Sequence, residues 1–270
     1  MSESKVNMSI INAECPEFLE KAVTPPAQEI GRTLSNIFYT IFYPINYNVD
    51  KLRKKTEINL KKYEEDIKSE INKIPEEKLT EPKISIVGPS LEASKYYIDN
   101  SEIRKMFAKL ISSSMNVDTY DIVHPSFVEI IKQLSPLDAS NFKSISLPNS
   151  QPIAKYRVLQ KDEISGLDVK TNIYLSNPEY NNPSTSEVDL ISSSISNLVR
   201  LGLVSISYTT HFVDESVYEK FKEFHLFNDI EEELRVNLLK NNNYPYKTVS
   251  ITKGIIQITP FGLNFAKICL

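Results

Sequence analysis

The clearest hydrophobic pattern of the chain lies between residues 28 and 74. Over 28–44 large apolar side chains recur at helical spacing and fall on one side of a helical wheel, with polar side chains on the other. Pro44 lacks a backbone N–H, so we expect this first helix to kink or end there. A second helix is predicted over 45–74, where a nearly straight apolar stripe of about 30 residues would reach about 45 Å, a length that suits a stalk between copies. The apolar positions of the first helix are Ile30, Leu34, Ile37, Phe38, Ile41, Phe42 and Ile45.

No formal charge stands between Arg32 and Asp50, a stretch that contains most of the first helix. About 17 residues at about 1.5 Å each span about 26 Å, slightly less than the roughly 30 Å hydrocarbon core of a bilayer. One copy alone would cross a membrane only marginally, whereas the polar faces of several copies could line a water-filled path. An amphipathic helix packed on its own protein would show the same pattern. The predicted pore-lining or membrane residues are Ser35, Asn36, Ile37, Phe38, Tyr39, Ile41, Phe42, Tyr43 and Asn46.

Basic side chains gather at the start of the second helix. Lys51, Arg53, Lys54 and Lys55 follow the apolar segment directly. An anionic inner leaflet would attract this cluster by about 1 kcal/mol per charge, and the positive-inside rule would then keep the C-terminal part cytoplasmic. A solvated helix face is the alternative explanation.

The second half of the chain predicts a winged-helix-like domain. Ser135 and Pro136 begin a helix with a capping-box sequence, Gly202 ends a later helix, and Thr259 caps the last one. Alternating apolar positions predict a strand over 204–208 and a hairpin that turns at 252–254. The stretch 209–246 is expected to be a helical, acidic insertion.

A winged helix often binds nucleic acid through its second helix and its wing. These would be residues 186–200 and 247–253, with Asn197, Arg200, Lys247 and Lys253 as candidate contacts. The net charge of −4 and the pI of about 5.6 argue against a general nucleic-acid coat, so such contacts would be local. Many modules of this kind hold only proteins together.

The pattern as a whole predicts a mainly α protein with a small α+β part. It divides into a mobile arm (1–27), an amphipathic or membrane helix with a long basic stalk helix (28–78), a helical middle domain (79–134) and the winged-helix-like domain (135–270). Cys15 and Cys269 lie far apart, without metal-ligand spacing. Neither His211 nor His225 stands in a nucleophile or metal motif. We therefore expect no enzyme activity, no metal and no cofactor.

Three ordered blocks of the chain resemble the abortive-infection alpha family of bacterial defence proteins. They span roughly Pro26 to Ala139 and read EIGRTLSNIFYTIFYPIN, NKIPEEKLTEPKISIVGPSLEASKYYIDNSEIRKMFAKLISSSM and VHPSFVEIIKQLSPLDA. The resemblance implies phage defence, without a catalytic residue set to carry over. Some relatives look like membrane effectors encoded beside a nucleotidyltransferase-like partner, as in the Hailong system, where a nucleic-acid ligand gates a membrane channel.

Two functions remain open at this point. The resemblance favours a homo-oligomeric effector at the inner membrane, on its cytoplasmic side, that forms a pore gated by a nucleic-acid oligomer. The alternative is a soluble, cytoplasmic winged-helix oligomer that binds nucleic acid or a partner protein and buries residues 28–74 as a dimerisation arm.

Overall fold

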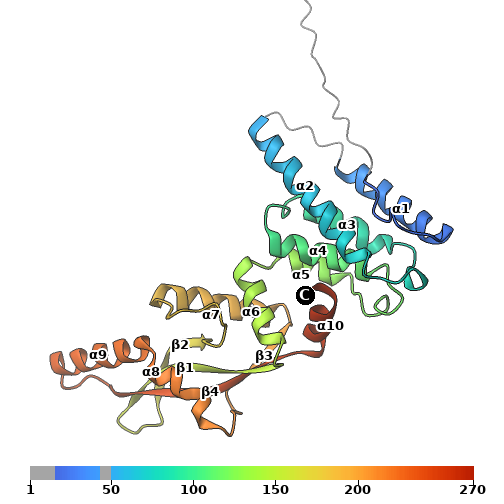
Figure 1. Cartoon of the computed structure of the whole chain (residues 1–270). Helices are drawn as coiled ribbons and strands as arrows, with labels where there is room; N and C mark the ends of the chain where they lie inside the picture. Colours follow the sequence, from blue (N-terminus) through green and yellow to red (C-terminus); the bar gives the residue numbers. More distant parts are fainter. Residues whose placement is uncertain (1–15, 43–49) are drawn as a thin grey trace, which may run out of the picture. The chain divides into compact units, whose positions relative to one another are not determined.

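The computed structural model describes residues 16–42 and 50–270, and the chain forms two compact units, Met1–Asp121 and Ile122–Leu270. Helices predominate, with one antiparallel sheet of four strands (Figure 1). The mainly α class with a small β part is therefore confirmed.

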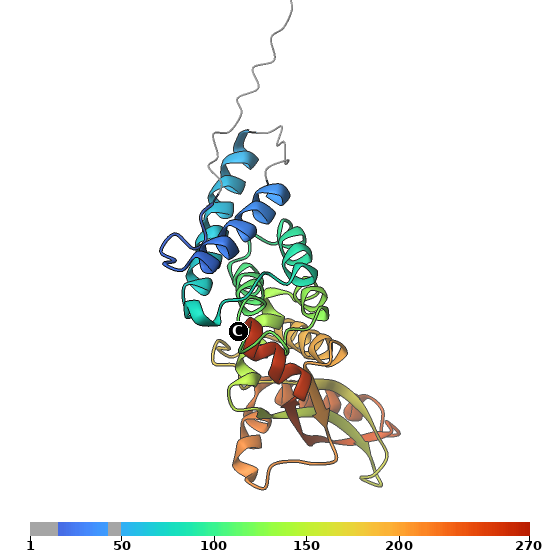
Figure 2. The same ribbon diagram turned by 90° about the vertical axis from the view of Figure 1, so that its right-hand side faces the viewer.

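Unit 1 is helical. Helix α4 occupies its centre and packs against both α2 and α3, while α1 lies beside α2 and α3 (Figure 2). Asn100 caps α4 by accepting hydrogen bonds from the backbone N–H groups of Glu102 and Ile103. The elements are α1 (Pro25–Phe42), α2 (Asp50–Ile71), the short 3₁₀ helix η1 (Glu76–Lys78), α3 (Ile84–Ser94) and α4 (Ser101–Ser113).

The unit boundary at residue 121 differs from the predicted boundaries at 78 and 134. Residues 79–121 belong with α2 because long-range contacts join them. Arg104 of α4 forms a largely buried ion pair with Asp66 of α2, at 2.6 Å. Leu79 pairs with Asn116 in an isolated antiparallel bridge. Neither contact has a local sequence signature.

Part of the predicted mobile arm is packed. Phe18 is buried, and its ring meets the Phe38 ring edge-on with centroids 5.3 Å apart. The arm prediction therefore differs from the structure over 16–24, where the buried Phe18 packs on α1; residues 1–15 lie outside the described part.

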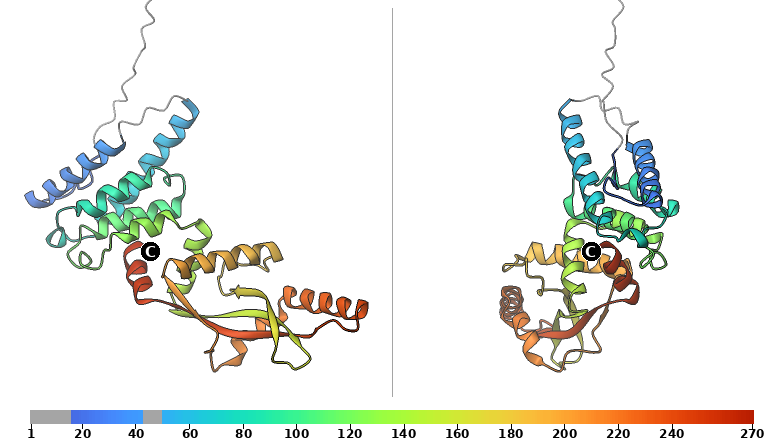
Figure 3. Two further views of the ribbon diagram at one scale, coloured as in Figure 1. Left: turned by 180° about the vertical axis from the view of Figure 1, so that it is seen from behind. Right: turned by 45° about the vertical axis from the view of Figure 1, so that its right-hand side comes forward.

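Unit 2 contains the sheet, whose strands lie in the order β2-β1-β4-β3. Figure 3 shows α7 running beside the sheet and the long strand β4 leading back from α9. The elements are α5 (Ser126–Lys132), α6 (Pro136–Ser146), β1 (Ser150–Gln160), β2 (Gly166–Ile173), α7 (Thr185–Arg200), β3 (Val204–Ser207), η2 (Glu215–Tyr218), α8 (Glu219–Glu223), α9 (His225–Lys240), β4 (Tyr246–Ile258) and α10 (Pro260–Cys269).

The helix signals of unit 2 are confirmed. Ser135 and Asp138 form the capping box of α6, and Thr259 Oγ1 accepts a hydrogen bond from the Gly262 N–H at the start of α10. Gly202 follows α7 with a φ of 72°, the left-handed conformation that glycine adopts most readily. The insertion at 209–246 contains η2, α8 and α9, so its helical character is confirmed too.

The predicted hairpin over 249–258, and with it the wing, is wrong. Residues 246–258 form one continuous strand that pairs with β1 from Gln257 opposite Ser150 to Tyr246 opposite Gln160. A Cβ atom at Gly254 would lie 2.7 Å from both the Ser207 carbonyl oxygen and Tyr208 Cδ1. The glycine thus permits a close approach of the neighbouring chain, and it makes no turn.

Candidate functional site

The predicted pore-lining and membrane residues of α1 fall in three different environments. Phe38, Phe42 and Ser35 are buried within unit 1, and Ser35 Oγ donates a hydrogen bond to the Gly31 carbonyl oxygen at 2.8 Å. Ile37 and Ile41 are half-buried, and Asn36 and Tyr39 are exposed. Tyr43 and Asn46 lie outside the described residues. The apolar face of α1 is therefore covered by its own unit over Leu34, Phe38 and Phe42.

Aromatic rings form the contact between α1 and α2. The rings of Phe38 and Phe42 each lie 6.1 Å, centroid to centroid, from the Tyr63 ring, which is fully buried. Such aromatic pairs add about 0.5–1.5 kcal/mol each beyond the burial of their area. None of the helices within residues 16–42 and 50–270 combines the length and the apolar character that a membrane crossing requires.

A carboxylate clamps the chain just before α1. Glu76, in η1, accepts hydrogen bonds from the Val23 N–H at 2.8 Å, the Thr24 N–H at 3.0 Å and the Thr24 hydroxyl at 2.7 Å. These bonds, that from Val23 foremost, lower the pKa of Glu76. The same segment also forms an ion pair, from Glu20 to Lys68 of α2, at 2.6 Å. Both polar contacts are largely exposed to solvent, so they orient the segment more than they stabilise it.

The predicted basic cluster lies on the first turns of α2. Its members Lys51, Arg53 and Lys54 are helical, but their side chains are outside the described part of the structure. Lys55 Nζ forms an exposed ion pair with Asp99 at 2.6 Å, and Asn59 donates to the other oxygen of the same carboxylate. Lys55 is thus paired within its own unit.

The candidate nucleic-acid residues of α7 serve internal contacts. The Asn197 amide donates to the Gln133 carbonyl oxygen at 3.1 Å and to the Asp138 carboxylate at 3.0 Å. The Arg200 guanidinium donates to the Asn197 side chain and to the Gln133 side chain. Both side chains tie the C-terminal end of α7 to the segment that joins α5 to α6. Asn197 is half-buried there, and Arg200 is exposed.

The two candidate lysines lie at different places on β4. Lys253 forms an ion pair with Glu215 of η2, and its ammonium lies 5.7 Å from the Tyr218 ring centroid. Lys247 lines a hollow of about 330 Å³ between α9 and β4. The structure therefore does not bring Asn197, Arg200, Lys247 and Lys253 together as one wing-and-helix surface.

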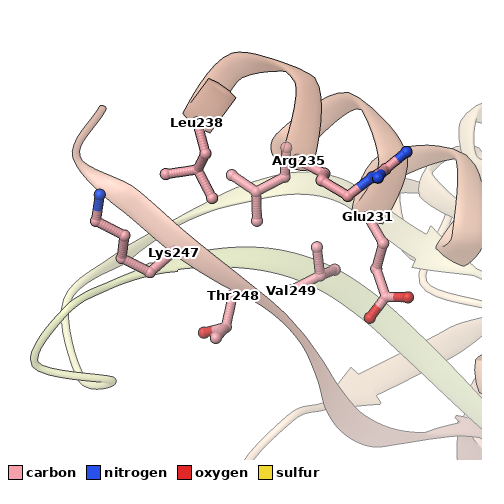
Figure 4. Close-up of a pocket in the computed structure, with 7 residues that line it drawn as sticks. Glu231, Arg235, Leu238, Lys247, Thr248 and Val249 are labelled. Atoms are coloured by element: carbon pink, nitrogen blue, oxygen red, sulfur yellow. The ribbon is translucent and has the colours of Figure 1, made fainter. Parts of the chain in front are cut away.

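Figure 4 shows the hollow beside Lys247, with Glu231, Arg235 and Leu238 of α9 facing Thr248 and Val249 of β4. The Arg235 guanidinium is held by the Glu232 carboxylate through two hydrogen bonds of 2.8 and 2.7 Å. Lys247 and Glu231 are then the charged side chains left at the hollow, beside the apolar Leu238 and Val249. One positive and one negative charge favour neither an anionic nor a cationic ligand.

A second hollow of unit 2, of about 490 Å³, contains Lys220, which the sequence did not single out. A lysine on a short helix in an acidic insertion gives no local signal of burial. As for metal sites, the described residues contain no group of three His, Cys, Asp or Glu side chains close enough to hold an ion.

Comparison with known proteins extends the resemblance beyond Ala139. The family model described as abortive infection alpha matches residues 55–269, which include most of unit 1 and nearly all of unit 2. No curated protein shows significant similarity to the chain. An uncharacterized protein from the hydrocarbon-degrading marine bacterium Alcanivorax borkumensis SK2 is similar at 17% identity over 53% of this chain and 90% of that chain, with a TM-score of 0.32, which is too low to support an argument. Because the family model covers more than half of its residues, the chain belongs to the abortive infection alpha family.

Proposed function

We propose that this protein is a non-enzymatic effector of abortive infection that acts at the cytoplasmic side of the bacterial inner membrane. In the active state, several copies would release α1 and assemble it into a ligand-gated pore. Membership of the abortive infection alpha family supports the defence role. The amphipathic character of α1 supports the mode of action.

The observation that carries the proposal is the way in which α1 is stored. Its large apolar side chains Leu34, Phe38 and Phe42 pack on protein, while Arg32 and Asn36 face solvent. Burial of these side chains contributes roughly 1.5–3 kcal/mol per side chain, whether α1 is packed on protein or inserted in lipid, because both surroundings are apolar. Transfer of α1 from its unit to a membrane would therefore cost mainly the specific packing around Phe18 and Tyr63.

Assembly would compensate for the short apolar segment. A single α1 lacks the length and hydrophobicity of a membrane span. In a ring of copies the polar side chains Asn36 and Tyr39 would face a water-filled path, and the half-buried Ile37 and Ile41 would face lipid or a neighbouring helix. The basic start of α2 would then rest on the anionic surface of the inner leaflet.

Gating requires a ligand that binds the released state more tightly than the stored one, since equal affinity for both states shifts nothing. We propose a nucleic-acid oligomer as that ligand and a nucleotidyltransferase-like partner as its source. The resemblance to relatives of that type supports both. Lys247 and the outer edge of Arg200 are the remaining candidates for contact with it.

Dye-loaded liposomes of anionic composition test the proposal. We expect ligand-dependent leakage by the wild type, and its loss when Ile37 and Ile41 are replaced by Asp, because two charges on this face oppose insertion. Thr33→Asp, on the exposed face, is the matched control and should leak like the wild type. Absence of leakage with every oligonucleotide tested, or equal leakage by the Ile37→Asp/Ile41→Asp variant, would refute pore formation.

One observation favours a second function, which is a soluble oligomer that binds nucleic acid or a partner protein. Phe38 is fully buried within its own unit, so α1 is covered here without a membrane and without the dimerisation expected of residues 28–74. Cell fractionation separates the two functions. Protein found only in the soluble fraction of infected cells, together with a salt-sensitive complex with DNA, would favour this second function.

A further inference from the structure

The hollow beside Lys220 differs from the hollow beside Lys247 in its charge. Its volume of about 490 Å³ lies within the range of roughly 300–1,000 Å³ that is typical of small-molecule sites. Leu175 and Val217 supply apolar wall, and Gln151 and Ser176 supply polar groups. No carboxylate belongs to its lining, so Lys220 is the one charged side chain that faces it.

Lys220 is half-buried and lacks a counter-charge. Its ammonium donates a hydrogen bond to Ser176 Oγ at 2.6 Å and lies 5.5 Å from the Phe221 ring centroid. Among residues 16–42 and 50–270 no carboxylate oxygen lies within ion-pair distance of it, and the nearby Glu219 and Glu223 of α8 are exposed. Burial lowers the pKa of Lys220, because the charged form loses hydration without gaining a partner.

We propose that this hollow binds a small molecule that carries a phosphate monoester, with Lys220 as the cation that receives the phosphate. A lysine ammonium is a compact charge that commonly binds phosphate. The Ser176 hydroxyl accepts a hydrogen bond from Lys220, and the Gln151 amide, whose nitrogen also donates to the Ser144 carbonyl oxygen at 3.4 Å, lines the same hollow. Leu175 and Val217 would contact the carbon body of the ligand. This site is independent of the proposed pore, since it uses no residue of α1.

The free N–H donors of Lys220 suit a phosphate, which has several acceptor oxygens. An anion that enters the hollow favours the charged state of Lys220 by direct attraction, and the ammonium has two further N–H donors beyond the one used by Ser176. Phosphate oxygens accept several such bonds at once. Binding must therefore raise the pKa of Lys220 toward the ordinary lysine value.

NMR of the full chain with ¹³C-labelled lysine tests the proposal, with inorganic phosphate and AMP as probes and adenosine and acetate as controls. We expect phosphate and AMP to shift the Lys220 signal saturably and to raise its pKa, and adenosine and acetate to leave both unchanged. Lys220→Gln removes the reporting side chain, so its phosphate affinity is measured by isothermal titration calorimetry beside the wild type, and it should be about tenfold or more weaker, the effect of removing a charge-assisted hydrogen bond.

The matched control is Lys222→Gln, an exposed lysine of the same helix, which should bind phosphate like the wild type. Shifts of the Lys220 signal that stay linear in phosphate concentration would overturn the proposal, as would equal binding by the two variants. If acetate bound as tightly as phosphate, the choice of a phosphate ester would be wrong. The wild-type titration decides the question even if Lys220→Gln fails to fold.

Discussion

Helix α1 of unit 1 and helix α7 of unit 2 are held to their neighbours by different kinds of contact. The face of α1 is apolar, with Phe38 and Phe42 against Tyr63. The face of α7 joins hydrophobic contact to a set of directional hydrogen bonds, among them the one from Asn141 of α6 to Ser194 at 3.0 Å. Hydrophobic contact has no preferred direction and can be exchanged for lipid or another protein, whereas a buried polar network tolerates only one arrangement. We therefore predict that α1 separates from its unit more easily than α7 does.

The polar network of unit 2 extends beyond α6 and α7. Asn141 and Asn177 are both buried, and the Asn177 amide donates to Asn141 Oδ1 at 3.1 Å and to Ser140 Oγ at 2.9 Å. The Tyr180 hydroxyl donates to the same Asn141 oxygen. The loop after β2 is thus pinned to α6, which in turn bonds to α7 through Asn141.

The largest effect is expected from Phe38→Ala in α1. Loss of a fully buried phenyl ring costs about 3–5 kcal/mol. If α1 is separable, this cost should appear as faster amide hydrogen exchange over residues 25–42, with unit 2 unchanged. Exchange that rises equally in both units would show that α1 and the rest of the molecule unfold together.

A somewhat smaller effect is expected from Asn141→Ala in unit 2. The change removes the hydrogen bonds that Asn141 makes with Ser194, Asn177 and Tyr180, and we expect a loss of about 2–3 kcal/mol in the free energy of unfolding. Urea unfolding followed by circular dichroism measures it. Ser193→Ala, on the exposed side of α7, is the control and should change stability by less than about 0.5 kcal/mol.

Arg200→Ala tests whether this arginine is structural. Its guanidinium is partly exposed, so we expect only about 1 kcal/mol of lost stability from its bonds to Asn197 and Gln133. The same variant should keep its oligonucleotide affinity if Arg200 only ties α7 to Gln133 at the end of α5. A loss of affinity with unchanged stability would instead make Arg200 a contact residue.

The smallest effect concerns Glu76 and pH. Because hydrogen bonds from Val23 and Thr24 lower its pKa, the carboxylate favours the docked segment at pH above its ordinary value of 4.5, and this contribution is lost as the pH falls through the lowered pKa. Amide exchange of residues 23–42, compared between wild type and Glu76→Gln at each pH, should differ at neutral pH and converge in acid. A constant difference at all pH values would exclude the carboxylate as the cause.

The sequence by itself determined the local features of this protein. The capping box at Ser135, the Thr259 cap and the end of α7 at Gly202 depend on side-chain and backbone groups within four residues of each other, so their signals are complete in the sequence. The amphipathic character of α1 and the family resemblance were also legible there.

Tertiary structure alone decided which partners these elements meet. The continuous β4 depends on pairing with β1, about a hundred residues earlier in the chain. From the sequence Gly254 predicts a turn, whereas the structure shows that it makes room for Tyr208. The uncompensated charge of Lys220 likewise arises from burial by distant segments. For α1 the reason is energetic, because moving its apolar face from water into lipid or into a protein core is favourable by a similar free energy. Only the packed structure therefore shows that Phe18 and Tyr63 cover this face.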